Sequence, residues 1–140
     1  MLALTLPDAE GVPQAIAQWK GRILVLNYWA TWCPPCREEM PAFSRLHEKY
    51  SANGVQFIGI SIDSPSKVKQ FSAETPVAYP LLISNLDIMQ TLADFGNVAQ
   101  GLPFTVIIDR NGTLYSTKLG RYDEAGLEIR LQELLAAPAG

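Results

Sequence analysis

Short apolar runs and segments of helical period alternate along the first half of the chain. Residues 23–29 form an apolar run whose single polar member is Asn27, and residues 55–62 form a second, mostly apolar run. Each run is too short for a helix and is typical of a strand buried on both faces. The segment between them carries apolar residues at helical spacing. This order predicts two parallel strands joined by a right-handed crossover.

The stretch after the second run predicts two further helices and a short strand. A turn and cap at residues 64–67 indicate the start of a helix that runs to about Glu74. Residues 79–83 are expected to be extended. Residues 85–95 have the apolar spacing of another helix, which Gly96 would end.

The last third of the chain predicts a hairpin and a final helix. Residues 104–109 and 113–119 flank the triplet Arg-Asn-Gly, which is a strong hairpin signal. A final amphipathic helix is indicated by Leu127, Leu131, Leu134 and Leu135. The predicted fold class is therefore α/β, with a mixed central sheet, a parallel centre, an antiparallel edge hairpin and helices on both faces. We expect residues 1–140 to form a single domain.

Composition narrows the class of protein further. The chain has 140 residues, of which 48% are hydrophobic and 18% charged, and this balance is typical of a globular domain. The net charge is −3 and the basic residues are scattered, so we expect no nucleic-acid binding. No apolar run approaches the roughly 18 residues of a membrane span, and the N-terminus lacks the features of a signal peptide. Either the protein is cytoplasmic, or a targeting segment is absent from this chain.

Candidate chemistry is concentrated in the cysteine pair. Cys33 and Cys36 are the only cysteines, and they follow the first predicted strand directly. Pro34 suits the first helical position, so Cys33 would lie at a helix N-terminus, where free N–H groups and the helix dipole favour a thiolate. Cys36 would lie one turn further in and be less exposed. Such a pair can divide thiol–disulfide exchange between an attacking and a resolving sulfur.

Two other interpretations of the pair are weaker. A structural disulfide gains most of its stabilisation by closing a long loop, and this loop has two residues. A zinc site needs four ligands, and only His47 remains to join the cysteines. We therefore expect no metal and no cofactor other than the Cys33–Cys36 disulfide itself. His47 is interpreted as a core or edge histidine rather than a catalytic one.

The helical wheel separates two adjacent acids behind the cysteines. Glu38 falls on the polar side, whereas Glu39 falls on the apolar side, one turn beyond Cys36. Burial should raise the pKa of the Glu39 carboxyl, which could then exchange protons with the thiols. Asn27 does not titrate, so it is either a hydrogen-bonding core residue or an oriented group near the site.

Two sequence blocks carry a resemblance to a known family. The string Leu-Asn-Tyr-Trp-Ala-Thr-Trp-Cys-Pro-Pro-Cys-Arg-Glu-Glu-Met-Pro at residues 26–41 resembles the TlpA/ResA-like thiol-disulfide oxidoreductases of the thioredoxin superfamily. A second block, Gly-Leu-Pro-Phe-Thr-Val-Ile-Ile-Asp-Arg-Asn-Gly at residues 101–112, is also similar to this family. Residues 64–95 resemble the family's insertion between two core units. The resemblance covers roughly residues 20–135 and implies a thioredoxin-like fold.

The resemblance implies roles for particular residues. Cys33 would attack and Cys36 would resolve, with Glu39 in the place of the acid that the family keeps beside its cysteines. Asn27 stands where ordinary thioredoxins have a buried Asp, so proton transfer would depend on Glu39. The implied substrate-binding residues are Trp32, Pro34, Leu102 and a cis Pro103.

Members of this family act outside the cytoplasm, commonly tethered to the membrane. The resemblance therefore implies a periplasmic or membrane-tethered reductase of protein disulfides, which can include apocytochrome c thiols in cytochrome c biogenesis. It would work as a monomer on a protein disulfide or thiol, recharged by a membrane electron donor such as a transmembrane thiol reductase. One alternative is a thiol peroxidase, although position 30 is Ala where that pattern needs Thr. Another is a redox-sensing chaperone or binding module.

Overall fold

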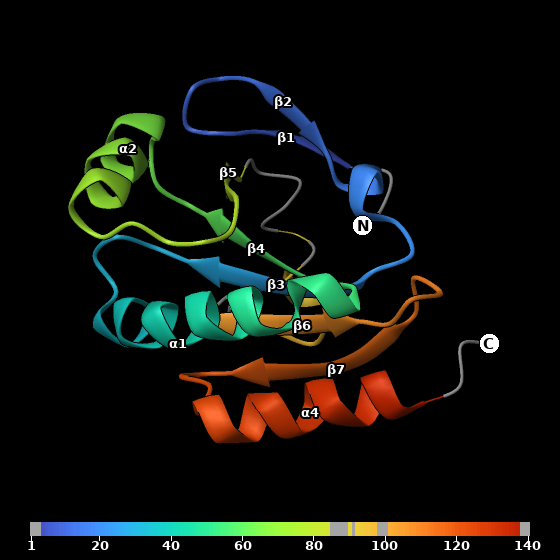
Figure 1. The fold of residues 1–140 in the computed structure, drawn as a ribbon. Coiled ribbons are helices and arrows are strands. Elements are labelled where there is room, and N and C mark those ends of the chain that lie inside the picture. Colours follow the sequence, from blue (N-terminus) through green and yellow to red (C-terminus); the bar gives the residue numbers. More distant parts are fainter. Residues whose placement is uncertain (1–3, 85–89, 91, 98–100, 138–140) are drawn as a thin grey trace.

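A five-stranded mixed sheet forms the centre of the protein (Figure 1). The computed structural model describes residues 4–84, 90, 92–97 and 101–137. The strand order is β5-β4-β3-β6-β7. The strands are β3 (Ile23–Trp29), β4 (Val55–Ser61), β5 (Leu81–Ile83), β6 (Phe104–Ile108) and β7 (Leu114–Leu119). Strands β5, β4 and β3 are parallel, and β6 and β7 continue the sheet antiparallel, which confirms the predicted parallel centre and edge hairpin.

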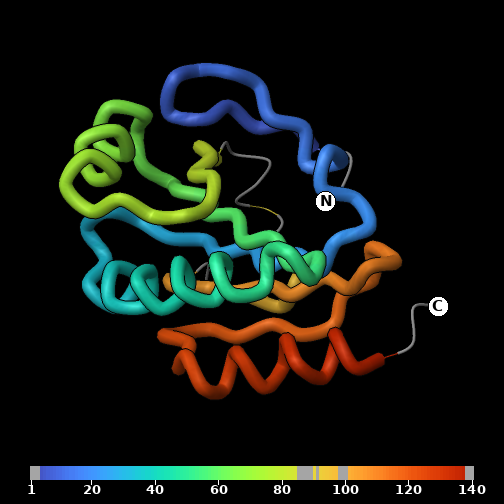
Figure 2. The backbone as a smooth tube through the Cα atoms, viewed as in Figure 1, coloured from blue at the N-terminus to red at the C-terminus, as the bar shows by residue number. Residues whose placement is uncertain are grey.

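Helices and an N-terminal hairpin cover the sheet. Helix α1 (Pro34–Tyr50) follows β3, and helix α4 (Glu124–Ala136) ends the described chain. Both helices pack on the same face of the sheet, where they contact apolar side chains of β3 and β4. The tube in Figure 2 shows the N-terminal hairpin and α4 on opposite sides of the molecule. That hairpin consists of β1 (Thr5–Pro7) and β2 (Pro13–Ala15) and is followed by the 3-10 helix η1 (Ile16–Trp19).

The alternation of side chains along β3 sorts the core into two layers. Leu24, Leu26 and Tyr28 point to the face that the N-terminal hairpin and η1 cover. Ile23 and Val25 point to the face that α1 and α4 cover. Because strand side chains alternate, Asn27 is directed to the α1 side as well. A polar group is thereby placed under α1, in an otherwise apolar layer.

The remaining elements frame the end of the sheet nearest the cysteines. Helix α2 (Pro65–Glu74) follows β4, and its buried Val68 and Phe71 join Trp29 and the two cysteines in a third apolar cluster. The short 3-10 helix η2 (Ser51–Asn53) links α1 to β4. Ser64 occupies the N-cap position of α2, but its side chain makes no capping hydrogen bond.

The sequence-based prediction of elements agrees with the structure where the two can be compared. Most of the helix expected at residues 85–95 lies outside the described residues; Gln90 and residues 92–94 are helical, and Gly96 has a φ of 97°. Among the described residues, no helix is long and apolar enough to cross a membrane.

Candidate active site

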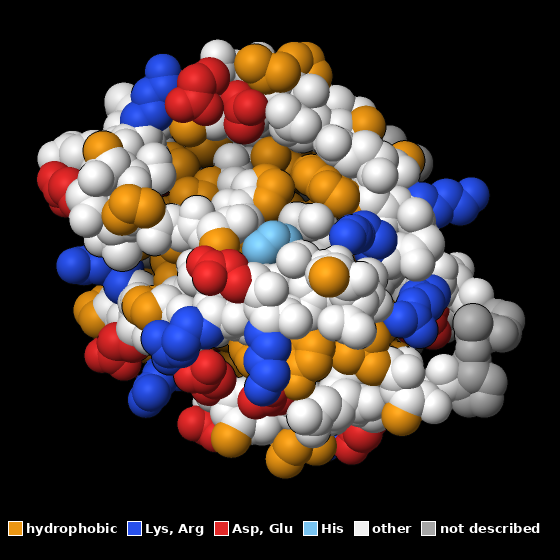
Figure 3. Space-filling view, in the orientation of Figure 1, with side chains coloured by type: hydrophobic (Ala, Val, Ile, Leu, Met, Phe, Trp, Pro, Cys, Tyr) orange, Lys and Arg blue, Asp and Glu red, His pale blue; other side chains and the backbone are white. Residues whose placement is uncertain are grey.

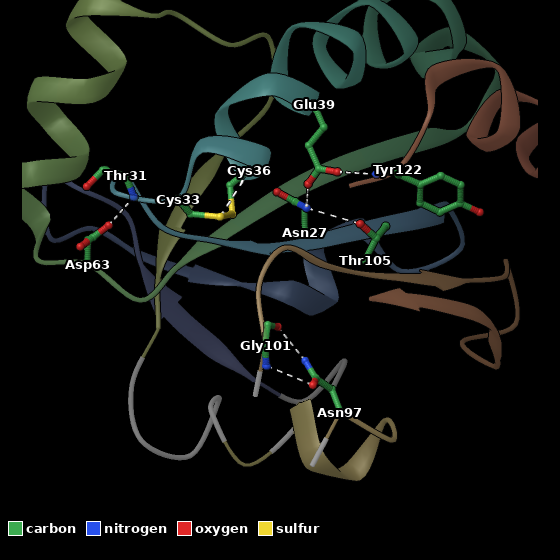
Figure 4. Close-up of a disulfide and its surroundings, with 10 residues drawn as sticks. All are labelled: Asn27, Thr31, Cys33, Cys36, Glu39, Asp63, Asn97, Gly101, Thr105 and Tyr122. Carbon is green, nitrogen blue, oxygen red and sulfur yellow. Dashed lines mark hydrogen bonds between the residues drawn. A yellow bond between two sulfur atoms is a disulfide. The ribbon is translucent and has the colours of Figure 1, made fainter. Parts of the chain in front are cut away.

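The two cysteines lie at the start of helix α1, shortly after strand β3 ends. Cys33 is the N-cap residue of α1, Pro34 is in its first turn, and Cys36 is one turn in (Figure 4). The cysteines form a disulfide with a Cα–Cα distance of 5.3 Å. The Cys36 backbone N–H donates to Cys33 Sγ at 3.4 Å, so a free N–H of the first helical turn points at this sulfur. The same N–H would stabilise a Cys33 thiolate after reduction.

The active-site segment is exposed on one side and buried on the other. Trp32 is 62% exposed, the largest value among the exposed large hydrophobic side chains that the structure describes. Cys33 retains 5% exposure and Cys36 none. An attacking sulfur must meet a partner molecule, whereas a resolving sulfur needs to reach only the first sulfur. The assignment of Cys33 as the attacking and Cys36 as the resolving sulfur stays a prediction, and this difference in exposure supports it.

Glu39 lies behind the disulfide, one turn beyond Cys36, and is only 1% exposed. Its Oε1 accepts a hydrogen bond from Asn27 Nδ2 at 2.7 Å, and its Oε2 accepts one from the Tyr122 backbone N–H at 2.9 Å. Burial raises the pKa of the Glu39 carboxyl from an ordinary 4.5 to about 7, although the two hydrogen bonds and the charges of Arg121 and Lys118 oppose that rise. A group with this pKa can both accept and release a proton near neutral pH.

Asn27 connects Glu39 to the antiparallel half of the sheet. The β3–β6 register places Asn27 opposite Thr105, and Asn27 Nδ2 also donates to Thr105 Oγ1 at 3.4 Å. We call Asn27, Glu39 and Thr105 the buried network. On its other side Asn27 faces Gly59 of β4, where a Cβ would lie 2.7 Å from Leu81 Cδ2 and 3.0 Å from Trp29 Nε1. Any side chain at position 59 would have to displace the ends of the Leu81 and Trp29 side chains, so the packing beside the network favours glycine.

The segment before β6 brings a cis-proline toward the same end of the sheet. The Leu102–Pro103 peptide bond is cis, as the resemblance implied. Leu102 packs against the apolar cluster that contains both cysteines. Asn97 holds the approach to this bond, because its Nδ2 donates to the Gly101 carbonyl at 2.8 Å and its Oδ1 accepts from the Gly101 N–H at 3.1 Å (Figure 4). The Asn97 side chain therefore fixes Gly101, the residue directly before the Leu102–Pro103 pair.

Sequence reasoning missed several residues that position the site. Asp63, just beyond β4, accepts a hydrogen bond from the Thr31 backbone N–H at 2.5 Å and so holds the loop that leads to Cys33. Its signal was available, since polar residues at the carboxyl ends of adjacent parallel strands meet at one edge of the sheet. Asn97 and Thr105 had no comparable signal, because their partners depend on loop geometry and strand register. The Tyr122 contact uses a backbone N–H and is invisible in the sequence.

His47 lies outside the site. Its Nδ1 accepts a hydrogen bond from the Phe57 backbone N–H at 3.3 Å, and burial lowers the pKa of its imidazole. It is therefore a hydrogen-bonded neutral side chain beneath α1, in agreement with the interpretation from sequence. Within the described ranges, no cluster of three or more His, Cys, Asp or Glu side chains could hold a metal ion.

The fold and the site define a class of protein. A mixed sheet carries a two-residue disulfide loop at a helix N-terminus, with a cis-proline segment packed beside it, and this combination defines a thioredoxin-like thiol-disulfide oxidoreductase. Residues 1–117 match the model of the AhpC/TSA family. The chain belongs to this family, and it is similar to ResA-type thiol-disulfide oxidoreductases.

Individual relatives support the same class. The chain is 31% identical over 129 residues to the thiol-disulfide oxidoreductase ResA of Bacillus cereus, which covers 91% of this chain and 72% of the relative. It is 29% identical over 130 residues to ResA of Geobacillus thermodenitrificans, covering 92% of this chain and 72% of the relative.

Solved structures give the same picture of the fold. A thioredoxin-related protein of Neisseria meningitidis serogroup B superposes with a TM-score of 0.82 at 30% identity, covering 94% of this chain and 99% of that one. A thiol:disulfide interchange protein of Chlorobium tepidum superposes with a TM-score of 0.85 at 24% identity, covering 95% and 93%, and supports the fold alone. Together these findings make the protein a thiol-disulfide oxidoreductase with a thioredoxin-like fold.

Proposed function

We propose that this protein is a reductase of specific protein disulfides that acts outside the cytoplasm. The observation that carries the proposal is the asymmetry of the disulfide, with Cys33 5% exposed at a helix N-terminus and Cys36 fully buried in front of Glu39. This arrangement suits a dithiol that gives two electrons to a partner protein and whose disulfide is then reduced again by another donor. The ResA relatives support the class of reaction, and the direction of electron flow is part of the proposal.

The reaction proceeds in two exchanges. The Cys33 thiolate attacks one sulfur of the substrate disulfide, forms a mixed disulfide and releases the other substrate sulfur as a thiolate, which takes up a proton. Cys36 then loses its proton and attacks Cys33 Sγ. This second step forms the Cys33–Cys36 disulfide and releases the remaining substrate sulfur as a thiolate. Two electrons have then passed from the two cysteines to the substrate, the two substrate thiolates take their protons from solvent, and the Cys36 proton stays on a base of the enzyme.

Glu39 is proposed as the proton acceptor for Cys36. It lies on the same face of α1, one turn away, and burial brings the pKa of its carboxyl to about 7. A carboxylate with this pKa can take the Cys36 proton near neutral pH and return it when the disulfide is reduced again. An exposed carboxylate, ionised throughout this range, would be a much weaker base.

The substrate face is proposed to include Trp32, Pro34, Leu102 and Pro103. Trp32 and Pro34 are exposed beside Cys33, and Leu102 packs against the cysteine cluster. The Pro103 carbonyl already accepts a hydrogen bond from the Gly120 N–H at 2.8 Å, so it is occupied. Pairing with an extended substrate backbone therefore falls to the groups on the Leu102 side of the bond.

The wider setting completes the proposal. Residues 1–140 act as a single domain and as a monomer, in the periplasm or facing it from a membrane tether. The substrate is a protein disulfide or thiol, and apocytochrome c is the candidate that the family resemblance of residues 26–41 implies. A transmembrane thiol reductase returns electrons to the Cys33–Cys36 disulfide. Nucleic acid has no part in this function.

Trapping of the mixed disulfide tests the proposal directly. Cys36→Ser leaves Cys33 able to attack but unable to be displaced, so the variant should accumulate a covalent adduct with substrate protein that dithiothreitol releases. Cys33→Ser is the matched control and should form no adduct. Equal adduct with both variants would show that Cys33 is not the attacking sulfur.

Direction is tested by equilibrium with glutathione. Related dithiols span roughly −270 to −120 mV, and a reductase should lie near the negative end. A value near about −120 mV would instead assign the protein as an oxidant.

Two alternatives give different results in the same preparation. A thiol peroxidase would consume hydrogen peroxide through Cys33, whereas the pattern lacks the Thr expected at position 30. A redox-sensing chaperone or binding module would bind clients without turnover, and Cys33→Ser would retain that binding.

A further inference from the structure

One polar atom of the buried network, Asn27 Oδ1, has no hydrogen-bond partner in the described part of the chain. Asn27 is 1% exposed, and its Nδ2 donates to both Glu39 and Thr105. Its Oδ1 is buried and has no hydrogen-bond partner among the residues that the structure describes. In Figure 4 this oxygen is turned to the side on which Cys36 lies, away from Glu39 and Thr105. A buried acceptor is rarely left unpaired, so its direction requires an explanation.

The orientation of the Asn27 amide follows from the charge on Glu39. The ionised carboxylate accepts hydrogen bonds only, so it requires the Nδ2 side of the amide at 2.7 Å. A protonated carboxyl instead has an O–H to donate, and the best acceptor within reach is Asn27 Oδ1 after a half-turn of the amide. The two protonation states of Glu39 therefore prefer opposite orientations of Asn27.

Thr105 accommodates both orientations. A hydroxyl is both donor and acceptor and rotates to suit its neighbours. In the orientation shown, Thr105 Oγ1 accepts from Asn27 Nδ2 at 3.4 Å. After a half-turn, the same hydroxyl donates to Oδ1. Valine has nearly the same shape as threonine and could serve neither orientation.

We infer that Asn27 is a positioning residue whose amide rotates with the protonation of Glu39 and reverses the polarity that it presents to Cys36. With Glu39 ionised, the amide presents an acceptor, which favours the Cys36 thiol. With Glu39 protonated, it presents a donor, which favours the Cys36 thiolate. The amide carries no proton in either direction. It couples the ionisation of Glu39 to that of Cys36, so that one group is protonated when the other is ionised. This inference rests on the proposed role of Glu39.

The charged and titratable groups around Glu39 do not replace this link. Arg121 and Lys118 act on its carboxyl through their charge and favour the ionised form, and the buried Tyr79 hydroxyl lies within range of its charge. Burial raises the pKa of Tyr79, which keeps it neutral in the range where Glu39 titrates. Asn27, by contrast, donates a hydrogen bond to the Glu39 carboxylate at 2.7 Å and also turns toward the side of the cysteines (Figure 4).

The test follows the side-chain amide of Asn27 by NMR in the oxidised protein, where neither cysteine titrates. On lowering the pH from about 9 to about 5, the Nδ2 protons should lose their nuclear Overhauser contacts to Thr105 and Glu39 and gain contacts to the Cys36 β-protons. The midpoint should match that of the Glu39 carboxyl carbon signal, near the pKa of about 7. Unchanged contacts across this range would overturn the inference.

Variants separate the rotation from the proposed role of Glu39. Glu39→Gln removes the titration, so the Asn27 signals should become independent of pH. Thr105→Val should weaken the coupling and separate the apparent pKa values of Cys36 and Glu39 in the reduced protein, and Thr105→Ser should restore it. If the Asn27 contacts stay fixed while Glu39→Gln still alters thiol titration, the rotation is wrong and the role of Glu39 stands. If Glu39→Gln leaves thiol titration unchanged, the proposed role of Glu39 fails instead.

Discussion

The carboxylates of this protein lie in two contrasting regions. In the buried network, Glu39 has an amide and a backbone N–H as partners and is almost fully shielded from water. At the surface between α1 and α4, Arg45 pairs with Glu124 at 2.6 Å and Lys49 pairs with Glu128 at 2.5 Å. We call these four residues the α1–α4 seam. Figure 3 shows basic and acidic side chains interspersed on the lower part of this face of the molecule.

The two regions give the same functional group opposite properties. The hydrogen bond from Arg45 lowers the pKa of Glu124, and the hydrogen bond from Lys49 lowers the pKa of Glu128. Burial raises the pKa of Glu39. A carboxylate with a paired cation and nearby water stays ionised at neutral pH. A buried carboxyl without a paired cation has a higher pKa and can hold a proton near neutral pH. The seam carboxylates therefore stay charged and serve as ion-pair partners, whereas Glu39 can exchange a proton near neutral pH.

The largest effect is expected from replacing Glu39, and its exposed neighbour Glu38 on α1 provides the comparison. Glu39→Gln should lower the rate of substrate reduction near neutral pH by about 100-fold, because a proton acceptor is lost beside Cys36. Glu38→Gln is the matched control. Its carboxylate is exposed and lies 3.9 Å from Arg121, so the rate should stay at the wild-type value. Rates are measured by stopped-flow mixing of reduced enzyme with a protein disulfide. Equal rates for both variants would remove Glu39 from the mechanism.

The pH dependence of stability should have opposite signs in the two regions. The folded-state pKa of Glu39 lies near 7 and its ordinary value is 4.5, so the folded protein binds an extra proton between these values. Its contribution is complete below pH 4.5 and is lost as the pH rises to 7, at a cost of about 3 kcal/mol. For Glu124 and Glu128 the folded pKa is lowered, so their contribution is present above the ordinary value and lost in acid.

Urea unfolding of the oxidised protein at several pH values measures this effect. The free energy of unfolding of wild type, minus that of Glu39→Gln, should fall between pH 4.5 and 7 and then level off. The same difference taken with Glu124→Gln should rise with pH from the acid side. A flat difference for Glu39→Gln would mean that the carboxyl is not buried in solution.

Glycine substitutions sharpen the comparison through packing. Gly59→Ala places a methyl group 2.7 Å from Leu81 and 3.0 Å from Trp29, beside the buried network, and should destabilise the protein by about 1–3 kcal/mol. Gly126→Ala is the control in α4, where the nearest atom to the new methyl is 3.9 Å away. It should be neutral or stabilising by up to about 1 kcal/mol. Denaturant midpoints would distinguish the two, and equal values would mean that the space above Gly59 is open.

The smallest effect is expected at the seam. Arg45→Ala removes an exposed ion pair, and such pairs contribute little because water and salt screen them. The thermal midpoint should fall by roughly 2 °C or less, and the difference should shrink in high salt. Substrate reduction should not change. A large loss of stability would show that the seam holds α4 on the molecule more strongly than its exposure suggests.

Local sequence patterns were sufficient to predict the strand and the helix that carry the active site. The apolar run of β3, the cysteines after it and Pro34 in the first turn together predict where α1 begins, because each signal depends on neighbouring residues alone. The wheel of α1 separated Glu38 from Glu39 for the same reason, since helical geometry is regular. The structure leaves Glu39 1% exposed and Glu38 on the surface.

Other parts of the site were beyond local pattern. Thr105 lies 78 residues from Asn27 along the chain, and only the β3–β6 register places the two opposite each other. The Tyr122 N–H reaches Glu39 across 83 residues. Asp63 holds the loop before Cys33, and Asn97 holds the loop before Pro103, each through contacts that depend on how loops fold over the sheet.

The sequence by itself determined the class of chemistry and the helix that carries it, because a two-residue disulfide loop, a capping position and an amphipathic wheel are properties of short segments. Only the tertiary structure decided the surroundings of Glu39. Its burial, the donors to its two oxygens and the Asn27 oxygen that no described residue pairs arise where α1, β3, β6 and the segment before α4 meet. A pKa depends on all the neighbours of a group at once, and those neighbours come from distant parts of the chain.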